Sequence, residues 1–211
     1  MIDLFAITDD PAPPLPTVAP LSAVASHGLA LVCAPAAHVE VSPEVLWRHE
    51  EVVEALMEDR DLLPVRFGTR LDDETAAARA LGERHEELAS ALDRVRGAVE
   101  LSVRVLGERP GEADADPPDP VTGAEYLRAK AAAAAGERSA LRSVHEPLAS
   151  RARESKRLAA RDRNELLRAA YLVDRSAVEP FVEQVSRLQH AKPRLRLLCT
   201  GPWPPYSFSG E

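Results

Sequence analysis

The sequence predicts an α+β protein of two domains, each a small sheet with helices on one face. Three observations support this fold class. Segments with apolar residues at helical spacing alternate with short apolar runs typical of buried strands. The composition is 45% hydrophobic, which provides for a core rich in alanine and leucine. An acidic, proline-rich stretch at 108–120 separates an N-terminal part, 1–107, from a C-terminal part, 121–211.

The N-terminal part alternates strands and helices. Its proline-rich segment excludes regular structure, because proline fixes φ and lacks a backbone donor. One helix begins at Ser42-Pro43-Glu44, where serine suits the N-cap, proline the first helical position and glutamate the positive end of the dipole. The predicted elements are a strand at 2–7, a loop at 11–20, a strand at 28–34, a helix at 42–59, a strand at 62–68, a helix at 72–96 and a strand at 98–106.

The linker and the C-terminal part follow. Residues 108–120 contain five acids and four prolines, a composition typical of a solvated linker. The later strands and helices predict a ferredoxin-like layer, and the strand at 98–106 can belong to either domain. The predicted elements are helices from 121 to 164 interrupted at Pro147, a strand at 166–173, a helix at 176–190 and a strand at 194–200.

Charge and chain ends limit the classes of partner. The chain has 26 Lys and Arg against 34 Asp and Glu, a net charge of −8, so we expect neither nucleic-acid nor anionic-membrane binding. Its few aromatic residues also disfavour RNA recognition on the sheet. The N-terminus lacks a signal-peptide pattern and no apolar run reaches 18 residues, which predicts a soluble, cytoplasmic protein. Cys33 and Cys199 lie in apolar runs and are expected to be reduced core thiols.

The stretch "RHEEVVEALMEDRDLLPVRFGT" at 48–69 raises the question of a metal or acid–base site. A helical ligand pair needs His49 to have a partner three or four residues away, and those positions hold only valine and leucine. Glu50, Glu54 and Glu58 recur at steps of four, which favours a solvated face or an acidic stripe for a basic partner. Arg66 either faces solvent or pairs with a carboxylate in the predicted strand. We therefore predict no metal, cofactor or catalytic residue.

Two further segments are candidate interaction surfaces. Residues 138–168 carry nine Lys or Arg against four acids and predict a solvated helix with ion pairs, or else a docking surface for an acidic partner such as the linker. The segment 201–210 concentrates aromatic residues among prolines. Because a free tail of this kind would expose apolar surface, we expect it to dock on its own protein or on a partner. The tail residues expected to dock are Trp203, Pro204, Pro205, Tyr206 and Phe208.

Three segments together resemble one family. "RHEEVVEALMEDRDLLPVRFGT", "AAYLVDR" and "CTGPWPPYSF" are similar to the gas vesicle proteins of the GvpF/GvpL family in order and spacing. The chain departs from the family at 123–127, where it has Gly-Ala-Glu-Tyr-Leu in place of Gly-Arg-Glu-Tyr-Leu. The matching positions at the C-terminal end are residues 201–206. Those in the first segment, which are also the expected partner-binding residues, are Arg48, His49, Glu50, Pro64, Val65, Arg66, Phe67, Gly68 and Thr69.

The resemblance implies a function. It predicts a non-enzymatic, two-domain accessory protein of gas vesicle formation, related to the ferredoxin-like layer. Such a protein would bind the major hydrophobic shell protein, other accessory proteins or both, and prevent aggregation of the shell protein while a vesicle nucleates. It could also stay with the vesicle as a minor component. The alternative, from the residues alone, is a small-molecule-binding protein or enzyme using His49 and Arg66 in a cleft between the domains.

Overall fold

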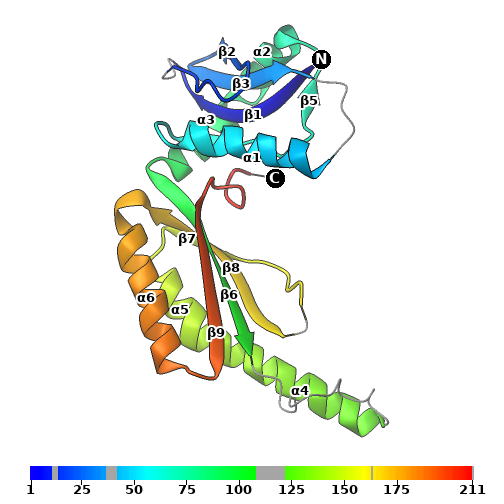
Figure 1. Ribbon diagram of the computed structural model, residues 1–211, viewed down its shortest axis with the longest axis vertical. Helices are drawn as coiled ribbons and strands as arrows, with labels where there is room; N and C mark the ends of the chain where they lie inside the picture. Colours follow the sequence, from blue (N-terminus) through cyan, green and yellow to red (C-terminus); the bar gives the residue numbers. More distant parts are fainter. Residues whose placement is uncertain (11–13, 37–41, 108–121, 163, 211) are drawn as a thin grey trace. The chain divides into compact units, whose positions relative to one another are not determined.

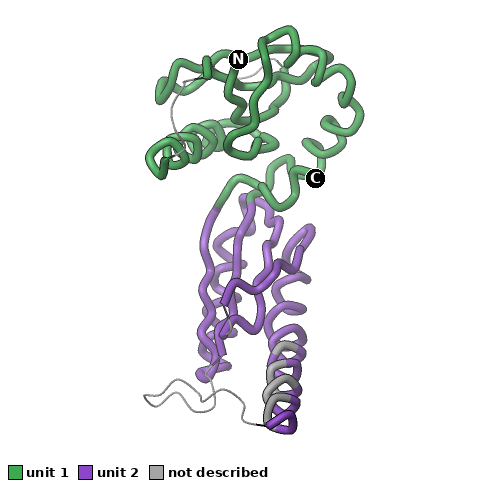
Figure 2. Tube along the Cα trace, turned by 90° about the vertical axis from the view of Figure 1, so that its right-hand side faces the viewer, with its two compact units in different colours: residues 1–99, 203–211 green, residues 100–202 purple. Residues whose placement is uncertain are grey.

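The chain forms two compact units, each built around one sheet. The computed structural model describes residues 1–10, 14–36, 42–107, 122–162 and 164–210. One unit joins residues 1–99 to the C-terminal segment from Trp203 onward, and the other is residues 100–202 (Figure 2). The mixture of helices and antiparallel strands confirms the predicted α+β class.

The N-terminal unit contains a sheet with β1 at its centre. The strand order is β2-β3-β1-β4, with β5 also pairing to β1 (Figure 1). β1 runs antiparallel to β3, β4 and β5. Each of these pairings brings together segments that are distant in the sequence. The strands are β1 (Ile2–Asp9), β2 (Ser22–Ser26), β3 (Leu29–Pro35), β4 (Leu62–Pro64) and β5 (Arg70–Leu71).

Helices cover both faces of this sheet. The helices are α1 (Pro43–Met57), α2 (Glu74–Glu83) and α3 (His85–Val95). α1 packs on a core that includes Val32 and Ala34 of β3, whereas α2 packs on β2 and β3 from the side of Cys33. Burial of β3 on both sides explains why its residues from Leu29 to Ala34 are all at most 8% exposed. The sequence predicted helices on one face because a continuous apolar run does not show which helix covers which side.

Two details of these helices differ from the prediction. Ser42 occupies the N-cap position of α1 in an extended conformation, but its side chain does not cap the backbone and bonds the carboxylate of Glu44 instead. The single helix predicted at 72–96 is divided at Arg84, whose φ of −116° and ψ of 18° leave the helical region. Gly82, a weak helix former, lies two residues before this break.

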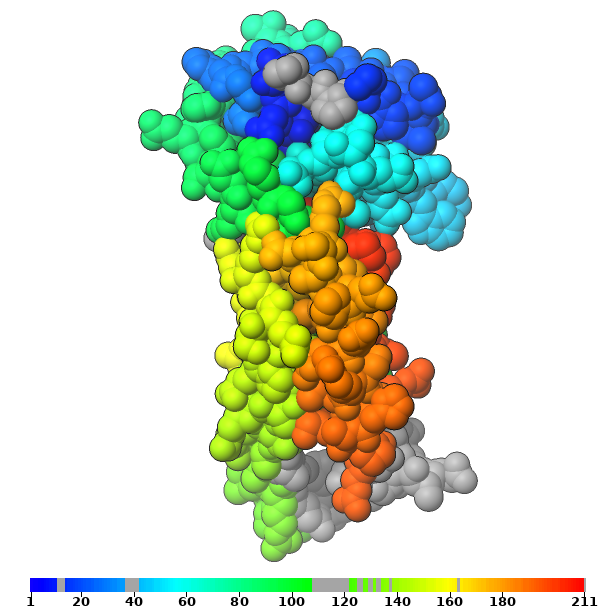
Figure 3. Space-filling view, turned by 90° about the vertical axis from the view of Figure 1, so that its left-hand side faces the viewer, coloured from blue at the N-terminus to red at the C-terminus, as the bar shows by residue number. Residues whose placement is uncertain are grey.

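The C-terminal unit has the element order β-α-β-β-α-β, which is that of a ferredoxin-like layer. Its sheet order is β7-β8-β6-β9, and Figure 3 shows α4 and α5 side by side with α6. The core lies between these helices and the sheet and includes Tyr171 and Phe181, both fully buried. The elements are β6 (Ala98–Gly107), α4 (Gly123–Ala140), the π-turn η1 (Leu141–His145), α5 (Glu146–Ala149), β7 (Glu154–Arg157), β8 (Glu165–Asp174), the 3₁₀ turn η2 (Arg175–Ala177), α6 (Val178–Ala191) and β9 (Leu195–Trp203).

The helical prediction for the basic segment is wrong in its second half. β7 replaces the predicted helix and pairs antiparallel with β8, with Ser155 opposite Tyr171. An edge strand of this kind is stabilised by its ladder with β8, which its own sequence does not reveal. Pro147 does not end the helical segment, which continues from α4 through the π-helical η1 into α5, and the helical geometry changes just before the proline.

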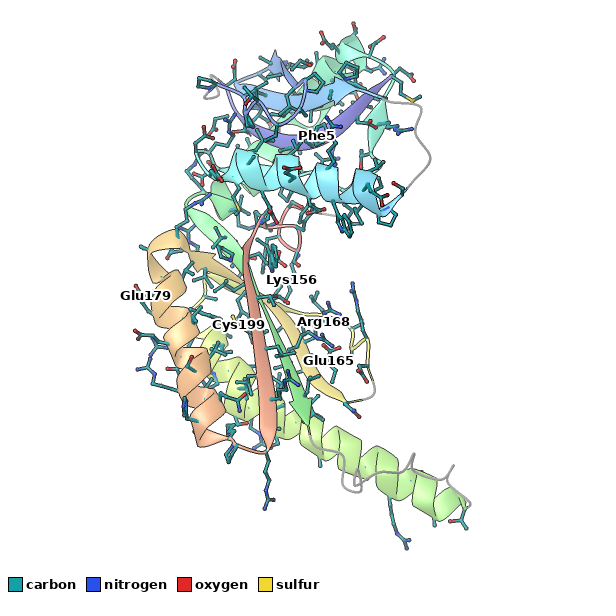
Figure 4. All side chains as sticks on the ribbon, viewed as in Figure 1. Phe5, Lys156, Glu165, Arg168, Glu179 and Cys199 are labelled. Atoms are coloured by element: carbon teal, nitrogen blue, oxygen red, sulfur yellow. The ribbon has the colours of Figure 1, made fainter. Side chains whose placement is uncertain are left out.

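Ion pairs were expected within a helix at 138–168, and the structure instead has two that join this segment to residues outside it. Arg104 of β6 donates to Glu165 of β8 at 2.6 Å, and Arg153 pairs with Asp174. The carboxylate of Glu165 is buried, and Figure 4 labels Glu165 and Arg168, both on β8.

The limits of the two units differ from the predicted domain limits at both ends. β6 lies between β8 and β9, so residues 100–107 belong to the C-terminal unit. The segment from Trp203 onward belongs to the N-terminal unit. Both assignments depend on long-range pairing and packing. The linker predicted at 108–120 lies outside the described residues.

Candidate functional site

An apolar pocket opens on the N-terminal unit between the first half of α1 and one end of the sheet. Its volume is about 250 Å³. β1, β3, α1, the loop before β2 and the turn after β4 all contribute to its walls. The apolar lining includes Leu4, Phe5, Ala34, Val45, Val52 and Phe67, and the polar lining is Asp3, Arg48, His49 and Arg70.

Phe5 reaches the pocket because of an irregularity in β1. The pairing of β1 with β3 shifts register between Leu4 and Ala6, as in a β-bulge. Phe5 and Ala6 consequently both belong to the core cluster under α1, although neighbouring strand residues normally point to opposite faces. Phe5 lies between the sheet and α1 (Figure 4).

His49 is a packing residue at the pocket wall. It is only 5% exposed, stacks on Phe5 at 5.0 Å between ring centroids and meets the ring of Phe67 edge-on at 5.5 Å. Its Nε2 lies 3.0 Å from the carbonyl oxygen of Val65, and because a carbonyl only accepts, this nitrogen carries the hydrogen. Burial lowers the pKa of His49, with the hydrogen bond to Val65 opposing this effect. The ring is therefore neutral near pH 7 and fastens the segment after β4 to α1.

The strand predicted at 62–68 ends at Pro64, and a tight turn follows. The amide of Val65 still donates to Phe5 at 2.8 Å, but the chain then bends back into β5. Thr69 stabilises the turn by donating its amide and its hydroxyl to the carbonyl of Arg66, at 3.2 and 2.8 Å. Gly68 has a φ of +82°, a backbone conformation that residues other than glycine rarely adopt.

Cations surround the pocket mouth. Arg66 is exposed at the turn, which selects the solvent-facing alternative for this residue. Arg70 donates to Asp3 at 2.6 Å, and exposed Arg48 lies on the first half of α1. The charged lining, two arginines and one aspartate, carries a formal charge of +1 in a chain of net charge −8.

The C-terminal tail packs on the same unit, beside the other side of α1. The hydroxyl of Tyr206 donates to Oε1 of Glu50 at 3.3 Å, and the side chain of Arg94 in α3 donates to the carbonyl of Phe208. Phe208 is fully buried, whereas Trp203 remains 41% exposed. Burial raises the pKa values of Glu50 and Tyr206.

The structure thus distributes the expected site residues over two places on one unit. Arg48, His49, Phe67 and Gly68 line the pocket, and Glu50 instead contacts the tail. Pro64, Val65, Arg66 and Thr69 shape the intervening turn. Among the tail residues, Pro204 and Pro205 are buried alongside Phe208.

Sequence reasoning missed several pocket residues. Asp3, Ala34 and Arg70 come from three distant segments, and no local pattern joins them. Leu46 and Trp47, two large apolar residues in succession on α1, lie outside the pocket lining and are 40% and 67% exposed, so they signal a separate apolar surface on this helix.

Other kinds of site receive no support from the described residues. No group of three or more His, Cys, Asp or Glu side chains within them could hold a metal ion. None of their helices is long and apolar enough to span a membrane. Cys33 and Cys199 are free thiols, and Cys33 is completely buried.

Comparison with known proteins identifies the family. Residues 4–210 match the sequence model of the family described as "Gas vesicle synthesis protein GvpL/GvpF". The chain belongs to the GvpL/GvpF family. The resemblance noted in the three sequence segments is therefore confirmed.

The similar proteins of the GvpL/GvpF family include members named L and members named F. Gas vesicle protein L of a Streptomyces species is 32% identical over 182 residues, which cover 77% of this chain and 67% of that protein. Gas vesicle protein F of the same species is 30% identical over 186 residues, covering 77% and 76%. The crystal structure of GvpF from an Anabaena species superposes with a TM-score of 0.83 at 22% identity, covering 100% of this chain and 96% of that one. This last likeness supports the fold.

Proposed function

We propose that this protein is a non-enzymatic accessory factor of gas vesicle formation that binds the major hydrophobic shell protein and prevents its aggregation during nucleation. Membership in the GvpL/GvpF family, described as gas vesicle synthesis proteins, supports the process. The proposed place of action is the cytoplasm, where vesicles form, with other accessory proteins as further partners. A net charge of −8 would help to keep a complex with an apolar subunit soluble.

The observation that carries this proposal is the apolar surface of the N-terminal unit. The pocket opens beside α1, and α1 also exposes Leu46 and Trp47. Exposed apolar side chains and apolar pockets are each typical of protein-binding surfaces, and this unit has both. The chemistry of the pocket supports binding over catalysis, because His49 is neutral and its Nε2 is committed to a carbonyl.

The proposal can be tested with full-length variants and matched controls. Leu46→Glu and Trp47→Glu place a charge on the proposed surface. Val182→Glu and Leu127→Glu change apolar residues of almost equal exposure, 41% and 65%, in the C-terminal unit. The purified major shell protein is diluted from denaturant, and its aggregation is followed by light scattering.

We expect the wild type and both controls to suppress aggregation and to co-purify with the shell protein, and the α1 variants to lose both properties. Equal suppression by all variants would contradict the surface, and failure of the wild type to bind would contradict the function. Fractionation of isolated vesicles separates an assembly factor, which is absent from them, from a minor vesicle component, which remains.

A further inference from the structure

The size of the pocket on the N-terminal unit suits a side chain better than a cofactor. Its volume of about 250 Å³ lies below the range of ~300–1,000 Å³ typical of small-molecule sites. The walls nearest α1 are the rings of Phe5 and Phe67 with Val52, and neutral His49 stacks among them. An aliphatic side chain inserted here would meet apolar surface on several sides.

Charged residues at the mouth of this pocket favour a negatively charged ligand. Asp3 already accepts from Arg70 at 2.6 Å, whereas no ion pair with Arg48 is found within the described part of the chain. Arg48 is exposed and lies beside Val45 and Val52 on the pocket side of α1. Arg66 adds another exposed cation on the turn next to Phe67. A carboxylate beside an inserted side chain would therefore meet positive charge.

We infer that the pocket anchors an aliphatic side chain from an acidic segment of the major shell protein, and that Arg48 pairs with a carboxylate next to that anchor. This inference rests on the proposed function, because it takes the shell protein as the partner. It adds which chemical class of segment the N-terminal unit recognises. An apolar anchor supplies most of the affinity, and the charge pair selects among segments.

The acidic face of α1 provides a competing preference, for a basic segment. Glu51, Glu54 and Glu58 are exposed on the same helix and would attract a basic segment. Helical spacing directs Val45, Arg48 and Val52 toward one side, whereas Glu54 and Glu58 point away from that side. A segment seated in the pocket is thus expected to meet arginine, and one lying along the outer face of α1 would meet glutamate.

Binding of two synthetic helical peptides distinguishes these preferences. Both carry the same leucine anchor on an alanine-based helix, with glutamates on either side of the anchor in one and lysines in the other. Fluorescence anisotropy measures their affinity for the full-length wild type, Arg48→Glu and Val45→Trp, which fills the pocket from α1. Arg79→Glu on α2 is the matched control, because it makes the same change of charge at a residue whose side chain is 74% exposed.

The wild type should bind the glutamate peptide more tightly, by about threefold to fivefold for an exposed charge pair. Arg48→Glu should abolish or reverse this preference, Val45→Trp should weaken both peptides, and Arg79→Glu should change neither. Circular dichroism melting of each variant establishes that it is folded. If Val45→Trp is not folded, Val45→Phe serves as a second variant that fills the pocket.

Different failures of this experiment have different meanings. Equal binding of the two peptides, or tighter binding of the lysine peptide, while the shell protein still binds the wild type, would overturn the inference and leave the proposed function standing. A preference for glutamate that persists in Arg48→Glu would also overturn it. If the shell protein does not associate with the wild type, both the inference and the proposed function are contradicted.

Discussion

The two units of this protein use similar sheets in different ways. In the C-terminal unit the helices and the sheet enclose a core in which Tyr171 and Phe181 are fully buried. The N-terminal unit has helices on both faces of its sheet, and α1 leaves an apolar pocket at its N-terminal half. The apolar pocket beside α1 is the reason for assigning the proposed binding surface to the N-terminal unit.

The largest expected effect is in the filled core. Phe181→Ala should reduce the free energy of unfolding of the C-terminal unit by about 3–5 kcal/mol, because it removes a large buried ring and leaves a cavity. Hydrogen exchange followed by mass spectrometry measures the loss for each segment. Val182→Ala, one position along the same helix and 41% exposed in the wild type, should cost less than about 0.5 kcal/mol. A comparable cost for both would refute the assignment of Phe181 to the core.

A smaller effect is expected at the pocket wall. His49→Phe keeps an aromatic ring between Phe5 and Phe67 but removes the donor to the carbonyl of Val65. The cost should be about 1–2 kcal/mol, as for a buried acceptor left without a partner. Urea unfolding of the two proteins gives this difference. If the variant is as stable as the wild type, the bond does not hold the turn.

The tail contact should contribute less. Tyr206→Phe removes the hydroxyl that donates to Glu50 at 3.3 Å and should reduce stability by about 0.5–1 kcal/mol. The ring itself remains available to pack on the core cluster under α1. Limited proteolysis at the C-terminus should therefore change little, whereas Phe208→Ala, at a fully buried position, should expose the tail to cleavage. Equal protection of both variants would show that the tail is held by other contacts.

The smallest effect is the dependence of stability on pH. Burial lowers the pKa values of His49 in the N-terminal unit and His145 in the C-terminal unit. Near pH 6.5 and below, the unfolded chain therefore binds more protons at these sites than the folded chain, so stability falls as the pH decreases. His49→Phe should reduce this slope in the N-terminal unit alone, as measured by hydrogen exchange at pH 7 and pH 5.5. An unchanged slope would contradict the neutral state assigned to His49.

Patterns of neighbouring residues in the sequence were sufficient to predict several helices and strands of this protein. The apolar run of β3, the start of α1 at Ser42-Pro43 and the strand β8 are each visible in a few neighbouring residues. These features depend on interactions within one element, so the sequence is sufficient to predict them.

Tertiary structure alone decided the rest. β7 is a strand because it pairs with β8, and the strand predicted at 62–68 ends at Pro64 because the chain turns back to pair Arg70 and Leu71 with β1. The pocket exists only where Asp3, Ala34 and Phe67, distant in the sequence, meet α1. Such features depend on which distant segments come together, and that choice is made by the free energy of the whole packed unit rather than by any local pattern.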